Sequence, residues 1–398
     1  MKNVRRLMWA ALVGGMLSVA ARAADEQRSP VRFSVDLREE YTDNRDAVER
    51  NAEGTFDTYL TPRIAVGFDL QPTILDFRYE PALRWRSDPS PFENEFMVLH
   101  DVGLKLQLRP AQVFTLRAGD DFYYTDDPKV EEDGAIVRGD RSYYLNRPEV
   151  GVNWKFTRQS ELDFYARYST KRYDAEDAAQ LFDEDKLDTG VTYFQRLVPR
   201  FGLKLVGRYN DYGYKDFGGY SRDFAVLMGG LGAEYAVTRQ TRAGAIVGWE
   251  NVEYDDDRFA SENGPYGELT FRGALLPVLR VEGAIAHGFR DSDGDPQRSV
   301  SPSQEYSQFL ARLEWDASDM LTLGGGATYR LGNYDVDTKW PMAGVSGDEN
   351  VLVAGVDASI KVAPHMRVKA SYKFENVDSD VRESYTKNTA AVGVGATF

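Results

Sequence analysis

Residues 389–398 alternate in polarity with a period of two. The even-numbered positions from Ala390 to Phe398 are apolar, and the odd-numbered positions are small or polar. This period indicates a β-strand with one apolar face, because successive side chains of a strand point to opposite sides. The strand ends on the aromatic Phe398. Such a segment is typical of a sheet that closes on its last strand with its apolar row facing lipid.

The same alternation recurs from residue 31 onward, in runs separated alternately by short and by long connections. The short connections recur at a spacing of roughly 40 residues and lie near Pro72, Pro110, Arg158, Pro199, Arg239, Pro277, Ser318 and Pro364. The long connections are rich in Asp, Glu, Gly, Asn and Ser. Strand 74–86 shows the pattern, with Leu75 and Phe77 on one face and Asp76 and Arg78 on the other.

Eight short and nine long connections predict 18 strands, with both ends of the chain on the short-turn side. We therefore expect an all-β fold, a transmembrane antiparallel up-and-down β-barrel over residues 31–398, with short periplasmic turns and long extracellular loops. A β-propeller would have a similar period but needs four short strands in each repeat. A soluble β-sandwich would also alternate, but with its charged face outside.

The N-terminus has the pattern of a secretory signal peptide. Lys2, Arg5 and Arg6 precede the apolar stretch 7–20, and Ala21-Arg22-Ala23 fits a cleavage site. The alternative is a membrane anchor helix, but about 14 apolar residues are fewer than the roughly 20 that a span needs. We expect a signal peptide at 1–23 and a short periplasmic segment at 24–30, and hence a bacterial outer-membrane location.

The amino-acid composition limits which partners and which kinds of site the protein can have. The formal net charge is −15, which argues against nucleic acid. The chain has no cysteine, so disulfides and thiolate metal sites are excluded. Clustered aspartates at 255–257 and 291–295 have neither the spacing nor the closing glutamate of a calcium loop. No metal, cofactor or catalytic site is predicted.

If the apolar rows face lipid, the other rows line the interior, and they are basic for so acidic a chain. A functional interpretation is a polar track for hydrophilic solutes, and a structural one is a ladder of ion pairs in a wet interior. The residues predicted to line the pore are Arg78, Arg84, Arg117, Arg167, Arg208, Arg272, Arg290, Arg312, Arg330, Arg367, Lys369 and Lys373. The longest loop, 126–141, has an apolar centre at 135–137. It could fold inward as a constriction or pack outside.

One pair of residues raises the question of catalysis. His287 and Ser307 fall on the apolar rows of two neighbouring strands, near their outer ends. A lipid-facing serine–histidine pair could serve a hydrolase. The alternative is a pair of polar side chains tolerated at the membrane interface, and we expect that the protein is not an enzyme.

The mature chain resembles the bacterial outer-membrane barrels called putative β-barrel porin 2. The resemblance rests on the hairpin period, the strand number and the passages 203–214 (LKLVGRYNDYGY) and 366–376 (MRVKASYKFEN). These barrels are found among exopolysaccharide biosynthesis and export proteins. The resemblance therefore implies a passive conduit for polysaccharide leaving the cell, without catalytic residues. It also implies that Phe398 is an assembly signal read by the barrel-insertion machinery.

Three functions follow as expectations. The first is a pore for export of a polysaccharide or another hydrophilic solute, with a general diffusion porin as its alternative. The second is a lipid-facing hydrolase, and the third is an adhesive or structural barrel acting through its acidic loops. The expected partners are outer-membrane lipid, lipopolysaccharide, the barrel-assembly machinery and polysaccharide export proteins.

Overall fold

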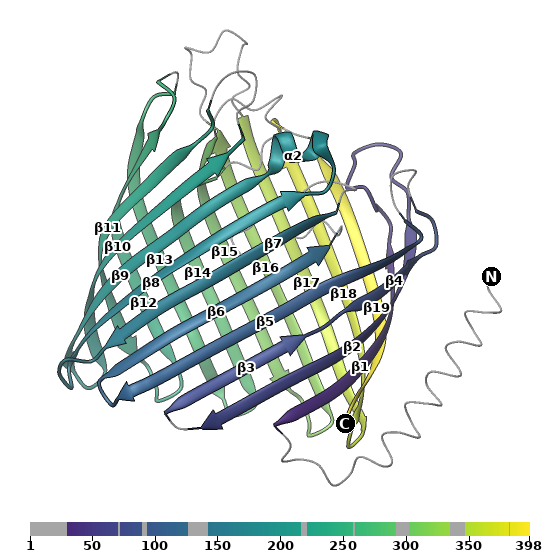
Figure 1. Ribbon diagram of the computed structural model, residues 1–398, viewed down its shortest axis with the longest axis horizontal. Coiled ribbons are helices and arrows are strands. Elements are labelled where there is room, and N and C mark those ends of the chain that lie inside the picture. Colours follow the sequence, from purple (N-terminus) through teal and green to yellow (C-terminus); the bar gives the residue numbers. More distant parts are fainter. Residues whose placement is uncertain are drawn as a thin grey trace.

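The computed structural model describes residues 30–70, 72–89, 94–125, 142–215, 221–257, 259–291, 302–334, 347–381 and 383–398. Within these ranges the strands form one antiparallel sheet that closes into a barrel (Figure 1). The predicted signal peptide, nearly all of 24–30, and loop 126–141 lie outside the described residues. In the described part, no helix is long and apolar enough to cross a membrane.

Each strand pairs with its neighbours in sequence, and β1 also pairs with β19, so that residues 34–42 run against 389–397. The strands are β1 (Val31–Thr42), β2 (Thr55–Leu70), β3 (Thr73–Tyr79), β4 (Ala82–Arg86), β5 (Phe96–Ala111), β6 (Phe114–Thr125), β7 (Tyr143–Trp154), β8 (Ser160–Tyr173), β9 (Glu184–Val198), β10 (Phe201–Tyr214), β11 (Phe224–Ala236), β12 (Arg242–Tyr254), β13 (Glu262–Leu276), β14 (Leu279–Asp291), β15 (Ser303–Asp316), β16 (Leu321–Tyr334), β17 (Gly347–Ala363), β18 (Met366–Ser379) and β19 (Tyr385–Thr397).

The predicted barrel of 18 strands is confirmed, although the sheet has 19 segments. β3 and β4 are two halves of one strand, because both lie between β2 and β5. The break falls at Glu80-Pro81. The registers on either side place Pro81 opposite Pro62 of β2. Neither proline has an N–H to donate, so the ladder cannot continue through this point.

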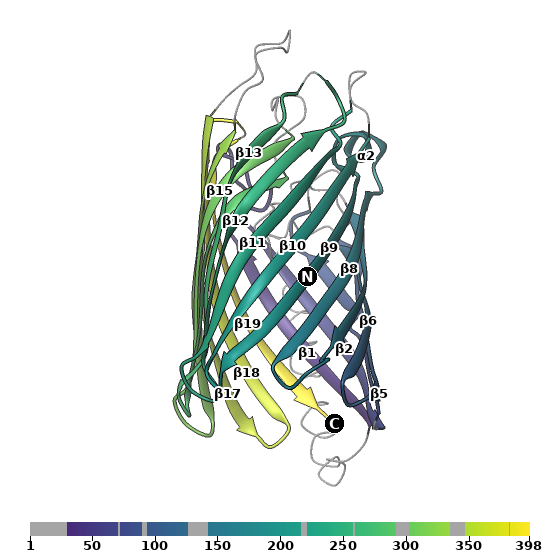
Figure 2. The same ribbon diagram turned by 90° about the vertical axis from the view of Figure 1, so that its left-hand side faces the viewer.

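The two rims of the barrel differ, as predicted. Short turns gather at the lower rim in Figure 1, where β1 begins and β19 ends, and the long connections gather at the upper rim. Figure 2 shows the tilted strands of the wall between these rims. One connection at the upper rim contains a short helix, α2 (Glu176–Phe182), where the sequence predicted only a loop. Its residues include good helix formers such as Ala, Gln and Glu.

Side chains of the wall separate into two rows, which we call the outer row and the inner row. The outer row carries large apolar residues that are exposed, among them Val247 (67%), Leu231 (64%) and Val356 (60%). Exposure of this much apolar surface around a closed sheet fits a wall surrounded by lipid. The inner row carries the charged residues, and the alternation within each strand is therefore confirmed.

At the upper rim, connecting segments fold over the inner row. Ala47, in the connection between β1 and β2, packs on Val351, Val377 and Tyr385 of β17, β18 and β19. Ala47 has a φ of 53°, a left-handed conformation that costs about 1–2 kcal/mol and turns the chain tightly here. On another part of the wall, Ala179 of α2 packs on inner-row side chains of β7 and β8. The inside of this rim is thus partly filled by protein.

Candidate pore interior

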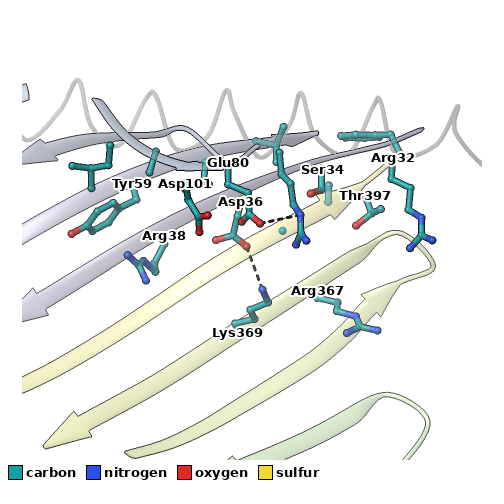
Figure 3. A pocket seen from close by; sticks show the side chains of 18 of the residues that line it. Arg32, Ser34, Asp36, Arg38, Tyr59, Glu80, Asp101, Arg367, Lys369 and Thr397 are labelled. Atoms are coloured by element: carbon teal, nitrogen blue, oxygen red, sulfur yellow. Dashed lines mark ion pairs between the residues drawn. The ribbon is translucent and has the colours of Figure 1, made fainter. Parts of the chain in front are cut away.

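The lumen contains a cavity of about 1190 Å³ lined mainly by β1, β2, β5, β6, β18 and β19. Arg32, Asp36, Arg38, Arg367 and Lys369 lie on its wall (Figure 3). These residues fix which row of each strand faces the interior. Residues that are paired across two strands lie on the same face, so the strand registers identify the inner row of every other strand of the barrel in turn.

All twelve basic residues predicted to line the pore fall on the inner row by these registers. They are distributed over β3, β4, β6, β8, β10, β13, β14, β15, β16 and β18. The alternation of each strand was sufficient to place them. Whether they line a path for solutes stays a prediction, because position on the inner row does not by itself show transport.

Most of these residues on β3 to β13 are held in ion pairs. Arg78 contacts Asp101 at 2.9 Å, Arg117 contacts Asp163 at 2.9 Å, and Arg167 contacts Glu149 at 2.5 Å. Arg208 contacts Glu268 at 3.2 Å and donates to the Tyr266 hydroxyl over 2.6 Å. Partly exposed pairs of this kind contribute little to stability, typically about 0–1 kcal/mol each. They nevertheless neutralise the arginines along this part of the wall.

Three of the twelve do not line open space. Arg84, Arg290 and Arg330 are 0%, 5% and 1% exposed. Arg330 of β16 donates to Glu349 of β17 over 2.9 Å, and Glu349 is itself 0% exposed. All three lie towards the upper rim, where the inside of the barrel is filled. The sequence could not separate them from the other nine, because burial here depends on which connections fold inward.

The remaining residues of the set lie on β13, β15 and β18 and differ in how closely they are paired. Arg272 is 3.8 Å from Glu282, Lys373 pairs with Glu375, and Lys369 is 3.7 Å from Asp36. Arg312 and Arg367 have no ion pair with any residue in the described ranges. Among the twelve predicted residues, the two without an ion pair therefore lie on β15 and β18.

A segment that the sequence analysis did not single out folds inward over the inner row at the upper rim. Loop 126–141 lies outside the described residues. The segment that folds inward is residues 43–54, held by the Asn44 side chain, which donates to the Thr386 carbonyl over 2.9 Å, and by Arg45, which donates to the Asp88 carbonyl. The apolar pair Ala47-Val48 inside an otherwise charged loop was the available signal.

The histidine–serine pair considered in the sequence is in direct contact. His287 and Ser307 are paired across β14 and β15, with Nδ1 3.0 Å from the serine Oγ. Glu305 lies 3.5 Å from Nε2 of the same histidine. All three side chains belong to the outer row. In the ranges that the structure describes, no group of His, Asp and Glu is arranged to hold a metal ion.

Comparison with solved structures shows the same fold. The outer-membrane channel OccK1 (OpdK) of Pseudomonas aeruginosa aligns with 92% of this chain and 99% of its own, at 12% identity and a TM-score of 0.50. OpdO of the same organism aligns with 92% of this chain and 97% of its own, at 14% identity and the same TM-score. At such low identity the likeness shows the fold alone. No curated protein sequence matches the chain.

A family comparison agrees with the resemblance seen in the sequence. The model described as putative beta-barrel porin 2 matches residues 207–398, from β10 to the closing strand. Neither this description nor the names of the similar structures refers to polysaccharide export, so that expectation gains no support. The chain is an outer-membrane β-barrel protein whose residues 207–398 match the model of the putative beta-barrel porin 2 family.

Proposed function

We propose that the protein is a passive diffusion pore for small hydrophilic solutes. The observation that carries this proposal is the cavity of about 1190 Å³ inside the barrel, lined largely by charged and hydroxylated side chains. A barrel of this strand number is too wide for side chains alone to fill its interior. Charged and hydroxylated side chains on the inner row suit water and hydrated solutes rather than apolar ones.

The inward segment 43–54 sets the limit on solute size. It covers the inner row of β17 to β19 at the upper rim, and α2 covers β7 and β8. A pore narrowed in this way would pass small solutes and retain large ones. An extended polysaccharide would need these segments to move, which favours general diffusion over polysaccharide export.

Conductance in planar lipid bilayers tests the proposal. The purified mature barrel is expected to give stepwise, ohmic increases in current in KCl. Liposome swelling with uncharged sugars of increasing size should then give a size limit. A folded barrel that neither conducts nor admits any sugar, even after residues 46–52 are deleted, would rule out a diffusion pore.

A further inference from the structure

We propose that the cavity at the closure of the barrel is a binding subsite for small hydroxylated organic carboxylates. The subsite consists of Arg32, Ser34, Asp36, Arg367, Lys369 and Thr397, and we call it the closure subsite. This inference rests on the proposed pore function and adds to it a class of solute. It is argued below from charge, from space and from hydrogen-bonding groups.

The first argument is charge. Arg32 of β1 and Arg367 of β18 are both exposed, and both line the cavity. Within the described ranges, neither makes an ion pair or a side-chain hydrogen bond. Lys369 has only a long contact of 3.7 Å with Asp36, and its side chain is 60% exposed. Three cations of one wall thus face water, and among the described residues Asp36 is the one acidic side chain that contacts any of them (Figure 3).

The other acidic groups of the cavity do not cancel this charge. Glu80 is engaged by Arg63 at 3.1 Å and by Arg78 at 3.4 Å. Asp101 accepts a hydrogen bond from Arg78 over 2.9 Å. The terminal carboxylate belongs to Phe398, which also lines the cavity. Arg38 adds a further cation, held over the Tyr59 ring and 3.5 Å from Glu40. Arg32, Arg367 and Lys369 thus outnumber the two carboxylates of the cavity that are left to balance them, Asp36 and the terminal carboxylate of Phe398, and the wall remains basic.

The second argument is space. The inner row of β19 has glycine at 393 and 395, between Lys369 and Arg367 of β18 and Arg38 and Asp36 of β1. A Cβ at Gly395 would lie 2.8 Å from Oδ2 of Asp36. Because β19 itself places no side chain between the charged rows of β18 and β1, the space over it is shared only with the side chains of those rows, among them the Asp36 carboxylate that lies over Gly395. The cations of β18 and β1 can reach a solute in that space from both sides.

The third argument is hydrogen bonding. The guanidinium group is planar and presents paired N–H donors that match a carboxylate. Ser34 and Thr397 are paired across β1 and β19 and place two hydroxyl groups between the arginines. Hydroxyl groups can donate to and accept from the hydroxyls of a solute. A solute with one carboxylate and several hydroxyls uses both kinds of group, and an uncharged polyol uses only the second.

Gluconate and sorbitol make a matched pair of probes, because they are similar in size and hydroxyl content and differ in charge. In planar bilayers, gluconate added on the short-turn side is expected to reduce the single-channel current in a saturable way, and sorbitol is not. In a KCl gradient, the reversal potential should show preference for chloride over potassium. Binding must stay weak enough for release, so block in the millimolar range is expected.

The test variant is the double substitution R32Q/R367Q in the mature barrel. It should weaken gluconate block by roughly tenfold, the loss expected when a charged hydrogen bond is removed, and shift the reversal potential towards potassium. The matched control is Arg280→Gln, another exposed inner-row arginine, which pairs with Glu314 away from the closure subsite. The control should leave gluconate block unchanged.

Two results would overturn the inference while leaving the pore intact. One is a wild-type barrel that conducts but shows no gluconate block. The other is block that R32Q/R367Q and Arg280→Gln weaken equally, because the effect would then be general charge and not a subsite. Inorganic phosphate, tested in the same way, separates carboxylate recognition from binding of any anion: equal block by phosphate contradicts the proposed solute class. A barrel that conducts nothing contradicts the pore itself.

Discussion

Asn388 of β19 donates to the Asp43 carboxylate twice, from its backbone N–H over 2.7 Å and from its side-chain amide over 2.6 Å. Asp43 follows directly on β1, so this contact joins the first residue of the inward segment to the strand that closes the barrel. Further along the segment, Ala47 packs on Val377 and Val351. The inward segment is therefore fixed to the wall at the closure of the barrel and at its neighbouring strands.

Deletion of residues 46–52, with Asp43 and Asn44 kept, should increase the single-channel conductance. The deletion removes the part of the segment that covers the inner row and leaves the closing contact with Asn388 in place. The comparison variant lacks residues 126–141. If that second deletion enlarges the pore and the first does not, segment 43–54 is not the narrowest point.

The buried pair of Arg330 and Glu349 should be important for stability. Replacing Glu349 by Ala leaves a buried guanidinium without its carboxylate, which typically costs about 3–5 kcal/mol. The free energy of unfolding, measured by urea titration in detergent micelles, should fall accordingly. Glu314→Ala is the control, because its partner Arg280 is exposed and a pair screened by water in this way contributes little to stability.

A double variant tests the cause of that loss. Replacing both members by apolar residues, in R330M/E349L, removes the buried charge along with its partner. Such replacements are often neutral or stabilising, so the variant should recover most of the stability that Glu349→Ala loses. If the double variant is as unstable as the single one, the loss comes from packing and not from an uncompensated charge.

Deletion of Phe398 should reduce the amount of folded barrel in the outer membrane more than it changes conductance. Its backbone N–H donates to the Phe33 carbonyl over 2.7 Å, at the end of the β1–β19 ladder. Assembly depends on closing this ladder, and we expect the insertion machinery to recognise the terminal aromatic residue. Phe309→Ala, at an exposed outer-row position of β15, is the control for general loss of an aromatic group. An unchanged yield after deletion of Phe398 would contradict the role in assembly.

The sequence was sufficient for the parts of the fold that depend on alternation. In a strand with a period of two, one row of side chains faces lipid and the other faces the interior. The apolar row of each strand identified the lipid-facing side. All twelve predicted basic residues consequently lie on the inner row. The contact between His287 and Ser307 could be predicted for a similar reason, because both residues lie near the same end of adjacent strands and on the same row.

Other features depend on contacts between segments distant in the chain, and alternation carries no information about them. Arg84 and Arg367 occupy equivalent inner-row positions in sequence, yet one is fully buried and the other is exposed. The break at Pro81 is another example. Pro62, Pro148 and Pro265 lie within strands, so a proline alone does not decide the outcome. The break depends on Pro81 lying opposite Pro62, and only the register reveals this.

The outer-row contact between His287 and Ser307 is expected to have no hydrolytic activity. A serine hydrolase needs N–H donors aimed at the developing oxyanion. Around Ser307 the strand is paired on both sides, with β14 at His287 and with β16 at Leu331, so its backbone N–H groups are engaged in the sheet. The Glu305 carboxylate is also 3.5 Å from the histidine, longer than a good hydrogen bond.

The purified barrel should therefore not release fatty acid from phospholipid in mixed micelles, with or without calcium, and should not react with a fluorescent phosphonate at Ser307. His287→Ala should leave conductance and folded yield as in the wild type. Labelling of the wild type that is lost in both Ser307→Ala and His287→Ala would show that this pair is a nucleophile and its base after all. Labelling that persists in Ser307→Ala would come from another protein in the preparation, which a second purification step would remove.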